Sequence, residues 1–138
     1  MKPENEKLID DFLAHADDLG DDIMADIGEM LGVMPFIFSI LRNRPDTFAL
    51  STLADYRFSR PDSLDAKTAE LVTMAAAAGA GADDCLKVHM KAALKEGASR
   101  DEILDVLQIA AMIGKTRVLA SSLRRFREVC GDGREAGE

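Results

Sequence analysis

The sequence predicts a single all-α domain, and three observations support this. The chain has 138 residues, the length of one ordinary domain, which buries about two-thirds of the surface that its unfolded chain exposes. Hydrophobic residues make up 47% of it, enough to offset the entropy of ordering most of the chain. Aromatic residues are only 5%, and the rest of the apolar content is aliphatic and rich in Ala, as in helices rather than strands.

The first predicted helix is amphipathic and acidic. Its apolar residues recur every three or four positions, on one side of a long helix: Leu8, Phe12, Ala16, Leu19, Ile23, Ile27 and Met30. Residues 1–29 carry ten acids and two bases, a net charge of −8, whereas residues 30–138 carry 15 of each. Because this distribution offers a polyanion no basic surface, neither nucleic acid nor an anionic membrane is an expected partner.

Proline and glycine divide the rest of the chain into shorter predicted helices. We expect them over residues 36–43, 45–60, 65–78, 83–96 and 99–113, with a last helix after a break at Gly114. Ser99 and Glu102 have the spacing of a capping box, and Gly97 suits the end of the helix before it. The second of these helices has four expected inward residues: Phe48, Leu50, Leu53 and Phe58.

Nothing in the sequence predicts export or membrane insertion. The beginning is acidic and lacks the continuous apolar segment of a signal peptide. The longest uncharged stretch of small residues, residues 71–82, has twelve residues, where a spanning helix needs about 20. Two cysteines, Cys85 and Cys130, do not make a disulfide framework, so a reduced, cytoplasmic protein is expected.

Cys85 and His89 are the first candidates for chemistry. Being four residues apart on a helix, their side chains lie about 40° apart around its axis. A lysine stripe points the other way, so lysines in water would turn the thiol and imidazole inward: Lys87, Lys91 and Lys95. The helix N-terminus favours a thiolate at Cys85, whereas Asp83 and Asp84 oppose it. A buried cysteine and a hydrogen-bonded core histidine are the structural alternative.

Glu70 strengthens the functional interpretation. Apolar neighbours crowd it, and a short glycine-containing connection joins its helix to that of Cys85. A carboxylate in that position can orient the imidazole and tune its basicity, although a surface glutamate is the commoner case. Zinc needs three or four ligands, and the only histidines are His15 and His89, so we expect no metal and no other cofactor.

The most specific sequence signal is a set of four spaced residues. Glu70 is followed by Cys85 fifteen residues later, by His89 four further on and by Gly97 eight beyond that. These places match the signature of the carboxymuconolactone decarboxylase and alkylhydroperoxidase D superfamily. The chain resembles this family from Leu31 to about Arg125, and further matches support it: Gly32-Val33-Met34-Pro35-Phe36, Pro45 and residues 64–114.

The resemblance implies an all-α domain of about six helices over residues 31–129. In this family a helical hairpin presents the matching side chains to a pocket, so Glu70, Cys85 and His89 are the expected catalytic residues. Residues 1–30 would add the acidic helix to the same domain, and residues 130–138 a flexible tail. Members are usually trimers or hexamers, and a long striped helix on so small a chain also needs a surface to cover it. The expected partner is therefore a homotrimer or homohexamer.

In the hydroperoxidase branch of the family the motif is C-x-x-C. The second cysteine attacks the peroxide, the first resolves the resulting sulfenic acid, and the Glu–His pair relays protons. Cys85 holds the second place, but Ala82 stands where the first cysteine would be. A peroxidase here would need an external thiol reductant, or Cys130, to resolve oxidised Cys85.

In the decarboxylase branch a histidine and neighbouring polar groups process a carboxylated lactone, and no cysteine pair is needed. A polyanionic lactone calls for arginines, and those near the relevant helices are each expected to be solvated: Arg42, Arg44, Arg57 and Arg60. Three functions stay open. We favour a thiol-dependent, antioxidant peroxide or disulfide oxidoreductase; the alternatives are a lactone-processing lyase that uses His89 and Glu70, and a non-catalytic oligomeric module.

Overall fold

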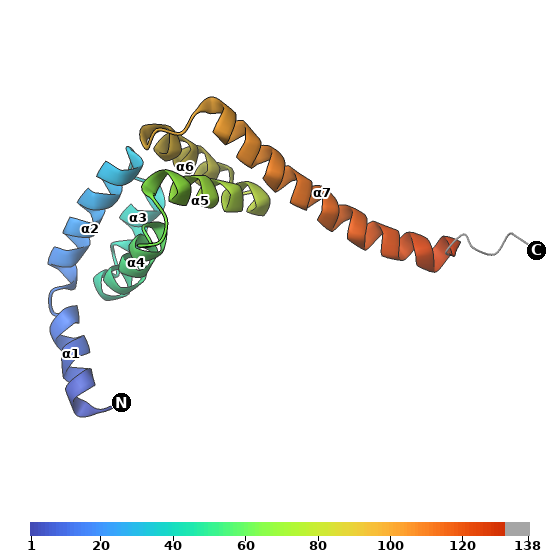
Figure 1. Ribbon diagram of the computed structural model, residues 1–138. Coiled ribbons are helices and arrows are strands. Elements are labelled where there is room, and N and C mark those ends of the chain that lie inside the picture. The colour runs from blue at the N-terminus through green and yellow to red at the C-terminus, as the bar shows by residue number, and fades with distance from the viewer. Residues whose placement is uncertain (132–138) are drawn as a thin grey trace, which may run out of the picture.

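The computed structural model describes residues 1–131, and every regular element in that range is a helix. Figure 1 labels them in chain order: α1 (Pro3–Leu13), α2 (Ala16–Leu31), α3 (Phe36–Leu41), α4 (Pro45–Ser59), α5 (Ala66–Ala80), α6 (Asp83–Lys95) and α7 (Arg100–Cys130). The predicted all-α fold is confirmed. The predicted tail falls mostly on residues 132–138, outside the described residues, and no described helix has both the length and the hydropathy to cross a membrane.

Several helix ends follow local sequence signals. Asp65 caps α5 by accepting a hydrogen bond of 2.8 Å from the backbone N–H of Thr68. Ser99 and Glu102 form the predicted capping box at the start of α7. Gly97, after α6, has a φ of +88°, a conformation that glycine adopts without the penalty of a side chain.

Two predicted boundaries are wrong. Gly114 does not break the last helix, since α7 runs through it without interruption. A single interior glycine costs a helix only about 1 kcal/mol, which the good helix formers around it offset. Conversely, the long first helix is divided between Leu13 and Ala16. The division coincides with the edge of the core, because Ala16 is buried whereas α1 has no buried residue.

The core consists of two clusters that share α6. The first joins α2, α4 and α6: Ile23, Ile27, Leu31, Phe48 and Ala92. The second joins α5, α6 and the beginning of α7: Met74, Ala93, Ala98 and Ile103. Ala92 and Ala93 are consecutive, so α6 is packed on two sides by different parts of the chain.

The buried face of α4 differs from the prediction. Phe48 is buried as expected, but the other three predicted inward residues are exposed: Leu50, Leu53 and Phe58. Ala49 and Thr52 are buried instead. The face of α4 that is buried is set by its packing on α2, and this neighbour cannot be identified from α4's own apolar residues.

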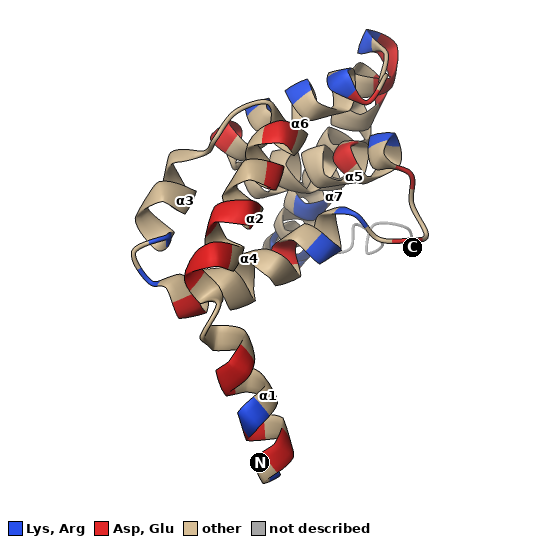
Figure 2. Cartoon of the chain, turned by 90° about the vertical axis from the view of Figure 1, so that its left-hand side faces the viewer, with Lys and Arg blue, Asp and Glu red and all other residues tan. Residues whose placement is uncertain are grey.

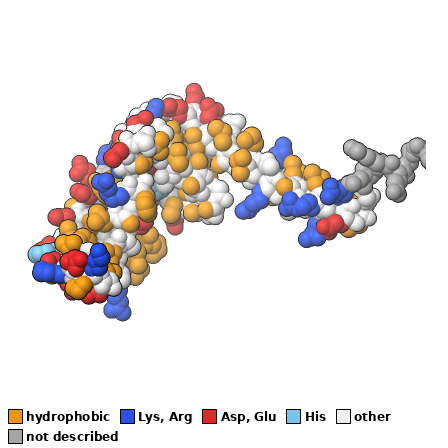
Figure 3. All heavy atoms as spheres, turned by 60° about the horizontal axis from the view of Figure 1, so that its bottom comes forward, with side chains coloured by type: hydrophobic (Ala, Val, Ile, Leu, Met, Phe, Trp, Pro, Cys, Tyr) orange, Lys and Arg blue, Asp and Glu red, His pale blue; other side chains and the backbone are white. Residues whose placement is uncertain are grey.

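Both ends of the described chain extend away from the body formed by α2–α6 (Figure 1). Figure 2 shows α1 projecting, with acidic residues along α1 and α2. Figure 3 shows basic side chains gathered near the far end of α7 beside hydrophobic ones. We call residues 109–130 of α7 the C-terminal arm. Its large apolar side chains are all exposed: Ile109, Met112, Ile113, Val118, Leu119, Leu123, Phe126 and Val129.

Candidate active site

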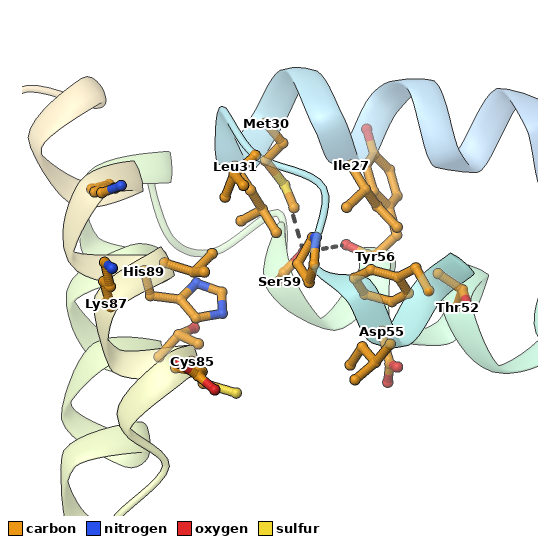
Figure 4. A pocket seen from close by; sticks show the side chains of 18 of the residues that line it. Ile27, Met30, Leu31, Thr52, Asp55, Tyr56, Ser59, Cys85, Lys87 and His89 are labelled. Carbon is orange, nitrogen blue, oxygen red and sulfur yellow. Dashed lines mark hydrogen bonds between the residues drawn. The ribbon is translucent and has the colours of Figure 1, made fainter. Parts of the chain in front are cut away.

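A cavity of about 620 Å³ lies among α2, α3, α4 and α6. Apolar side chains of α2 and α3 form much of its wall, and α4 contributes polar groups including Thr52, Asp55 and Tyr56. On the side formed by α6, Cys85 and His89 both point towards the cavity (Figure 4). The spacing of four residues on one helix has therefore placed the thiol and the imidazole at one site.

Glu70 lies beneath this cavity, not on the surface. Its side chain, on α5, is only 1% exposed, as the crowding of apolar neighbours in the sequence suggested. Nδ1 of His89 lies 2.7 Å from Oε2 of Glu70. On the other side of the carboxylate, Nη2 of Arg60 forms an ion pair with Oε1 at 2.7 Å. The helices α6 and α5 and the residue that follows α4 thus bring His89, Glu70 and Arg60 into one row.

The protonation of Glu70 is set by opposing effects. Burial raises the pKa of the Glu70 carboxyl, but the hydrogen bond with His89 and the contact with Arg60 lower it, and the net pKa is below its ordinary value. Glu70 is therefore a carboxylate at neutral pH. A carboxylate only accepts hydrogen bonds, so Nδ1 of His89 must be the donor in their contact.

The orientation predicted for α6 is only partly right. His89 is turned inward, with its side chain 19% exposed, whereas Cys85 is exposed at the cavity. The lysine stripe was expected to point away from the cavity, but Lys87 and Lys91 line it along with the thiol and imidazole. Long lysine side chains can reach round the helix to the edge of the cavity, which the helical angle alone does not predict.

Two of the four arginines that were expected to be solvated are instead held in ion pairs. Arg42 donates to carboxylate oxygens of Asp17 and Asp21, both at 2.9 Å, and its side chain is 19% exposed. Arg60 pairs with Glu70 and is 22% exposed. Sequence analysis missed Arg60 as a site residue, since no spacing rule links the end of α4 to the middle of α5. The expectation holds for Arg44 and Arg57, which are exposed.

Cys130 does not belong to this site. It is the last residue of α7, at the end of the C-terminal arm that leads away from the body (Figure 1). The two cysteines are both free and exposed. Within residues 1–131, no three His, Cys, Asp or Glu side chains gather in a way that suits a metal ion.

Comparison with known proteins assigns the chain to a family. The sequence model described as the carboxymuconolactone decarboxylase family matches residues 47–128, more than half of the chain and a range that contains Glu70, Cys85 and His89. Neither the curated proteins nor the solved structures that were compared include a match to the chain. Its helical fold and the matched residues together show that this chain belongs to the carboxymuconolactone decarboxylase family.

Proposed function

We propose that this protein is a thiol-dependent peroxidase in which Cys85 is the nucleophile and His89 moves the proton. One observation carries the proposal: the buried carboxylate of Glu70 holds His89 at 2.7 Å, in the wall of the cavity to which Cys85 also points (Figure 4). A nucleophile, a base and a group that orients the base are the parts that covalent catalysis needs.

In this proposal each nitrogen of His89 has its own role. Nδ1 donates to Glu70, so in the neutral imidazole Nε2 carries the lone pair and can accept a proton. The position of Cys85 in the first turn of α6 adds the favourable potential of a helix N-terminus to a thiolate. Asp83 and Asp84, in the same turn, act against it.

The proposed reaction oxidises Cys85 and reduces a hydroperoxide to an alcohol. Nε2 of His89 takes the thiol proton, and the sulfur of Cys85 attacks the terminal oxygen of a hydroperoxide. The O–O bond breaks, the sulfur becomes a sulfenic acid, and the departing alkoxide takes the proton from His89 to leave as an alcohol. The mainly apolar cavity suits an organic hydroperoxide better than a small polar one.

Recovery of Cys85 then depends on thiols from outside the chain. Ala82 occupies the place of a resolving cysteine, and Cys130 ends the C-terminal arm. A first external thiol condenses with the sulfenic acid, releasing water and forming a mixed disulfide. A second thiol attacks the external sulfur of that disulfide, so the two external thiols leave joined as a disulfide and the Cys85 thiol is restored.

Intact-mass measurement tests this proposal. After brief exposure to near-stoichiometric tert-butyl hydroperoxide, the wild type and Cys130→Ala should gain oxygen rapidly, and a dithiol should reverse the change. Cys85→Ala should not react, and His89→Gln should react more slowly. Cys130 is a matched control because it is also free and exposed. Equal rates at the two cysteines would count against the peroxidase.

Lys87 and Lys91 favour a second candidate, a lyase that acts on a carboxylated lactone. Both lysines line the cavity of His89 and supply positive charge suited to a carboxylate. This lyase activity would persist in Cys85→Ala and be lost in His89→Gln. The peroxidase, by contrast, would be lost in Cys85→Ala and only slowed in His89→Gln. If neither hydroperoxide nor lactone is consumed, the non-catalytic module is the remaining function.

We also propose that a second copy of this chain covers the C-terminal arm. The large apolar side chains of the arm are all exposed, and none of them is among the residues packed against the second core cluster. Charge favours the α2 face of another copy as its partner, because residues 106–127 hold five bases and no acid whereas α2 holds six acids and no base. Two arms side by side would instead bring like charges together.

The molar mass of the protein, measured by light scattering as it elutes from a size-exclusion column, tests this association. A homotrimer or homohexamer is expected for the wild type and for Ser121→Glu, whose side chain lies about 200° around the helix from Leu119. Leu119→Glu and Leu123→Glu should give monomers, and higher salt should weaken the assembly. A monomeric wild type at high protein concentration would contradict the proposal.

A further inference from the structure

Arg60 contacts Glu70 on the side away from His89. It is the residue after α4, and its Nη1 also donates to the backbone carbonyl of Ser59 at 2.8 Å, which fixes the guanidinium near the end of its own helix. Nη2 of Arg60 and Oε1 of Glu70 are both buried and have no hydrogen-bond partner elsewhere in the described chain. Their contact, at 2.7 Å, has the distance of an ion pair without the alignment of a hydrogen bond.

Arg60 lines a second cavity, separate from the one that holds the thiol. This cavity, of about 310 Å³, lies next to α2, the end of α4 and the end of α6. Arg60 lines it and His89 does not, whereas His89 lines the cavity of Cys85 and Arg60 does not. Glu70 therefore links the two cavities, with one carboxylate oxygen directed to each residue. Arg60 is placed to act on the chemistry only through Glu70.

We propose that Arg60 is a positioning residue that holds Glu70 as a carboxylate and so keeps Nε2 of His89 free to accept a proton. This inference rests on the proposed acid–base role of His89. The guanidinium stays charged at every physiological pH, so its effect on the carboxylate is permanent. A carboxylate that is 1% exposed would otherwise be costly to keep charged.

Loss of Arg60 would add one proton to the Glu70–His89 pair. If the proton binds Glu70, the acid becomes a donor to Nδ1, and the neutral imidazole must then carry its own proton on Nε2. If it binds His89, both nitrogens are protonated. In both cases Nε2 is no longer a base, so the outcome does not depend on which partner holds the extra proton.

Other charged groups line the two cavities on either side of Glu70. Around the second cavity they are Asp26, Glu29, Lys95 and Glu96, together with the phenol of Tyr56. On the His89 side they are Asp55, Asp84, Lys87 and Lys91, with the thiol of Cys85. Glu102 of α7 is held by Lys67 at the start of α5. Within the described residues, none of these groups forms an ion pair or hydrogen bond with Glu70, whose contacts are with Arg60 and His89, at 2.7 Å each.

The direct test is the protonation of the His89 ring, read by nitrogen and carbon NMR at pH 7.5, about one unit above the ordinary histidine value. His15, at the start of α2, is the only other histidine and serves as an internal reference. We expect the proton on Nδ1 in the wild type and in Arg57→Gln, an exposed arginine one turn earlier on α4. In Arg60→Gln we expect Nε2 to be protonated, with or without a proton on Nδ1, and Arg60→Lys should partly restore the wild-type signal.

Two results would overturn the proposal. One is a wild-type His89 that carries its proton on Nε2, a result that needs no variant and so survives a failure of Arg60→Gln to fold. The other is a folded Arg60→Gln with an unchanged His89 signal. Neither requires any reaction of Cys85, so they differ from a failure of the proposed peroxidase, in which the wild-type thiol would not react with hydroperoxide.

If Cys85 reacts as proposed, its pH profile gives a second readout. In Arg60→Gln the rate of oxidation should fall about tenfold near neutral pH and recover as the pH rises, because removal of one nearby charge shifts such titrations by about one unit or more. A purely structural role for Arg60 would lower the rate at every pH alike. Arg60→Lys, which keeps the charge, should restore most of the rate.

Discussion

The body of the molecule and its C-terminal arm use the same kind of apolar pattern with opposite results. In the body, residues such as Ile27 and Met74 lie in the core, with exposed fractions of 3% and 0%. In the arm, Leu119 and Phe126 recur at similar spacing but are 44% and 60% exposed. Apolar periodicity thus predicts that a helix has a face to cover, but it does not tell whether the cover comes from the same chain.

The largest expected effect is on the free energy of unfolding, and it comes from the same substitution made at a methionine of the body and at one of the arm. Met74→Ala should destabilise the protein by about 3 kcal/mol, because Met74 is fully buried and its removal leaves a cavity. Met112→Ala, on the arm, should change the stability of the monomer by less than about 0.5 kcal/mol. Urea unfolding measures both. Equal losses at low protein concentration would show that the arm is already packed within one chain.

Glu70→Gln tests the contacts of the buried carboxylate with Arg60 and His89, in the body. We expect a loss of about 2–3 kcal/mol, because the neutral amide leaves Arg60 facing an uncharged partner in a buried position. Glu4→Gln, on the exposed α1, should have almost no effect. The measurement is again urea unfolding.

The same variant gives a pH dependence with a definite sign. The pKa of Glu70 is lowered, so its contribution to stability is present above the ordinary value of 4.5 and is lost as the pH falls through the lower folded value. The difference between the wild type and Glu70→Gln should therefore shrink in acid. A difference that grows with acidity would show that Glu70 is protonated in the folded protein.

A smaller effect is expected at the beginning of α7, which belongs to the body. Ser99→Ala should cost about 1 kcal/mol, because it removes the capping hydroxyl. Lys67 and the backbone N–H of Ser99 lower the pKa of Glu102 to about 2, so this end of the helix should stay stable until the pH falls well below 4.5. Thermal unfolding against pH measures both. Ser121→Ala on the arm is the control, and an equal cost there would contradict the distinction.

The smallest effect is expected in the arm. Gly114→Ala should strengthen the helix locally by about 0.5–1 kcal/mol, since an alanine side chain there would have no atom outside the helix backbone within 4 Å. Slower amide hydrogen exchange just after residue 114 would measure it. Core amides near Met74 should be unchanged; if they also slow, the arm and the body unfold as one unit.

Much of the site could be predicted from sequence because its spacing lies within single helices. The distance of four residues between Cys85 and His89 is enough to place them at one cavity, and the apolar neighbours of Glu70 indicate its burial. Arg60 could not be predicted, since its contact depends on how α4 ends beside α5. The predictions of the buried face of α4 and of the direction of Lys87 are wrong for a similar reason. Each depends on packing partners and on the reach of side chains rather than on periodicity.

The position of α6 between the two core clusters makes it a shared wall. Ala92 packs in one cluster and Ala93 in the other, and the same helix carries Cys85 and His89. A disturbance of either half of the core therefore reaches the reacting groups through a rigid element. The alignment of thiol and imidazole should consequently report on the integrity of the entire body, and damage far from the cavity should be felt there as lost reactivity.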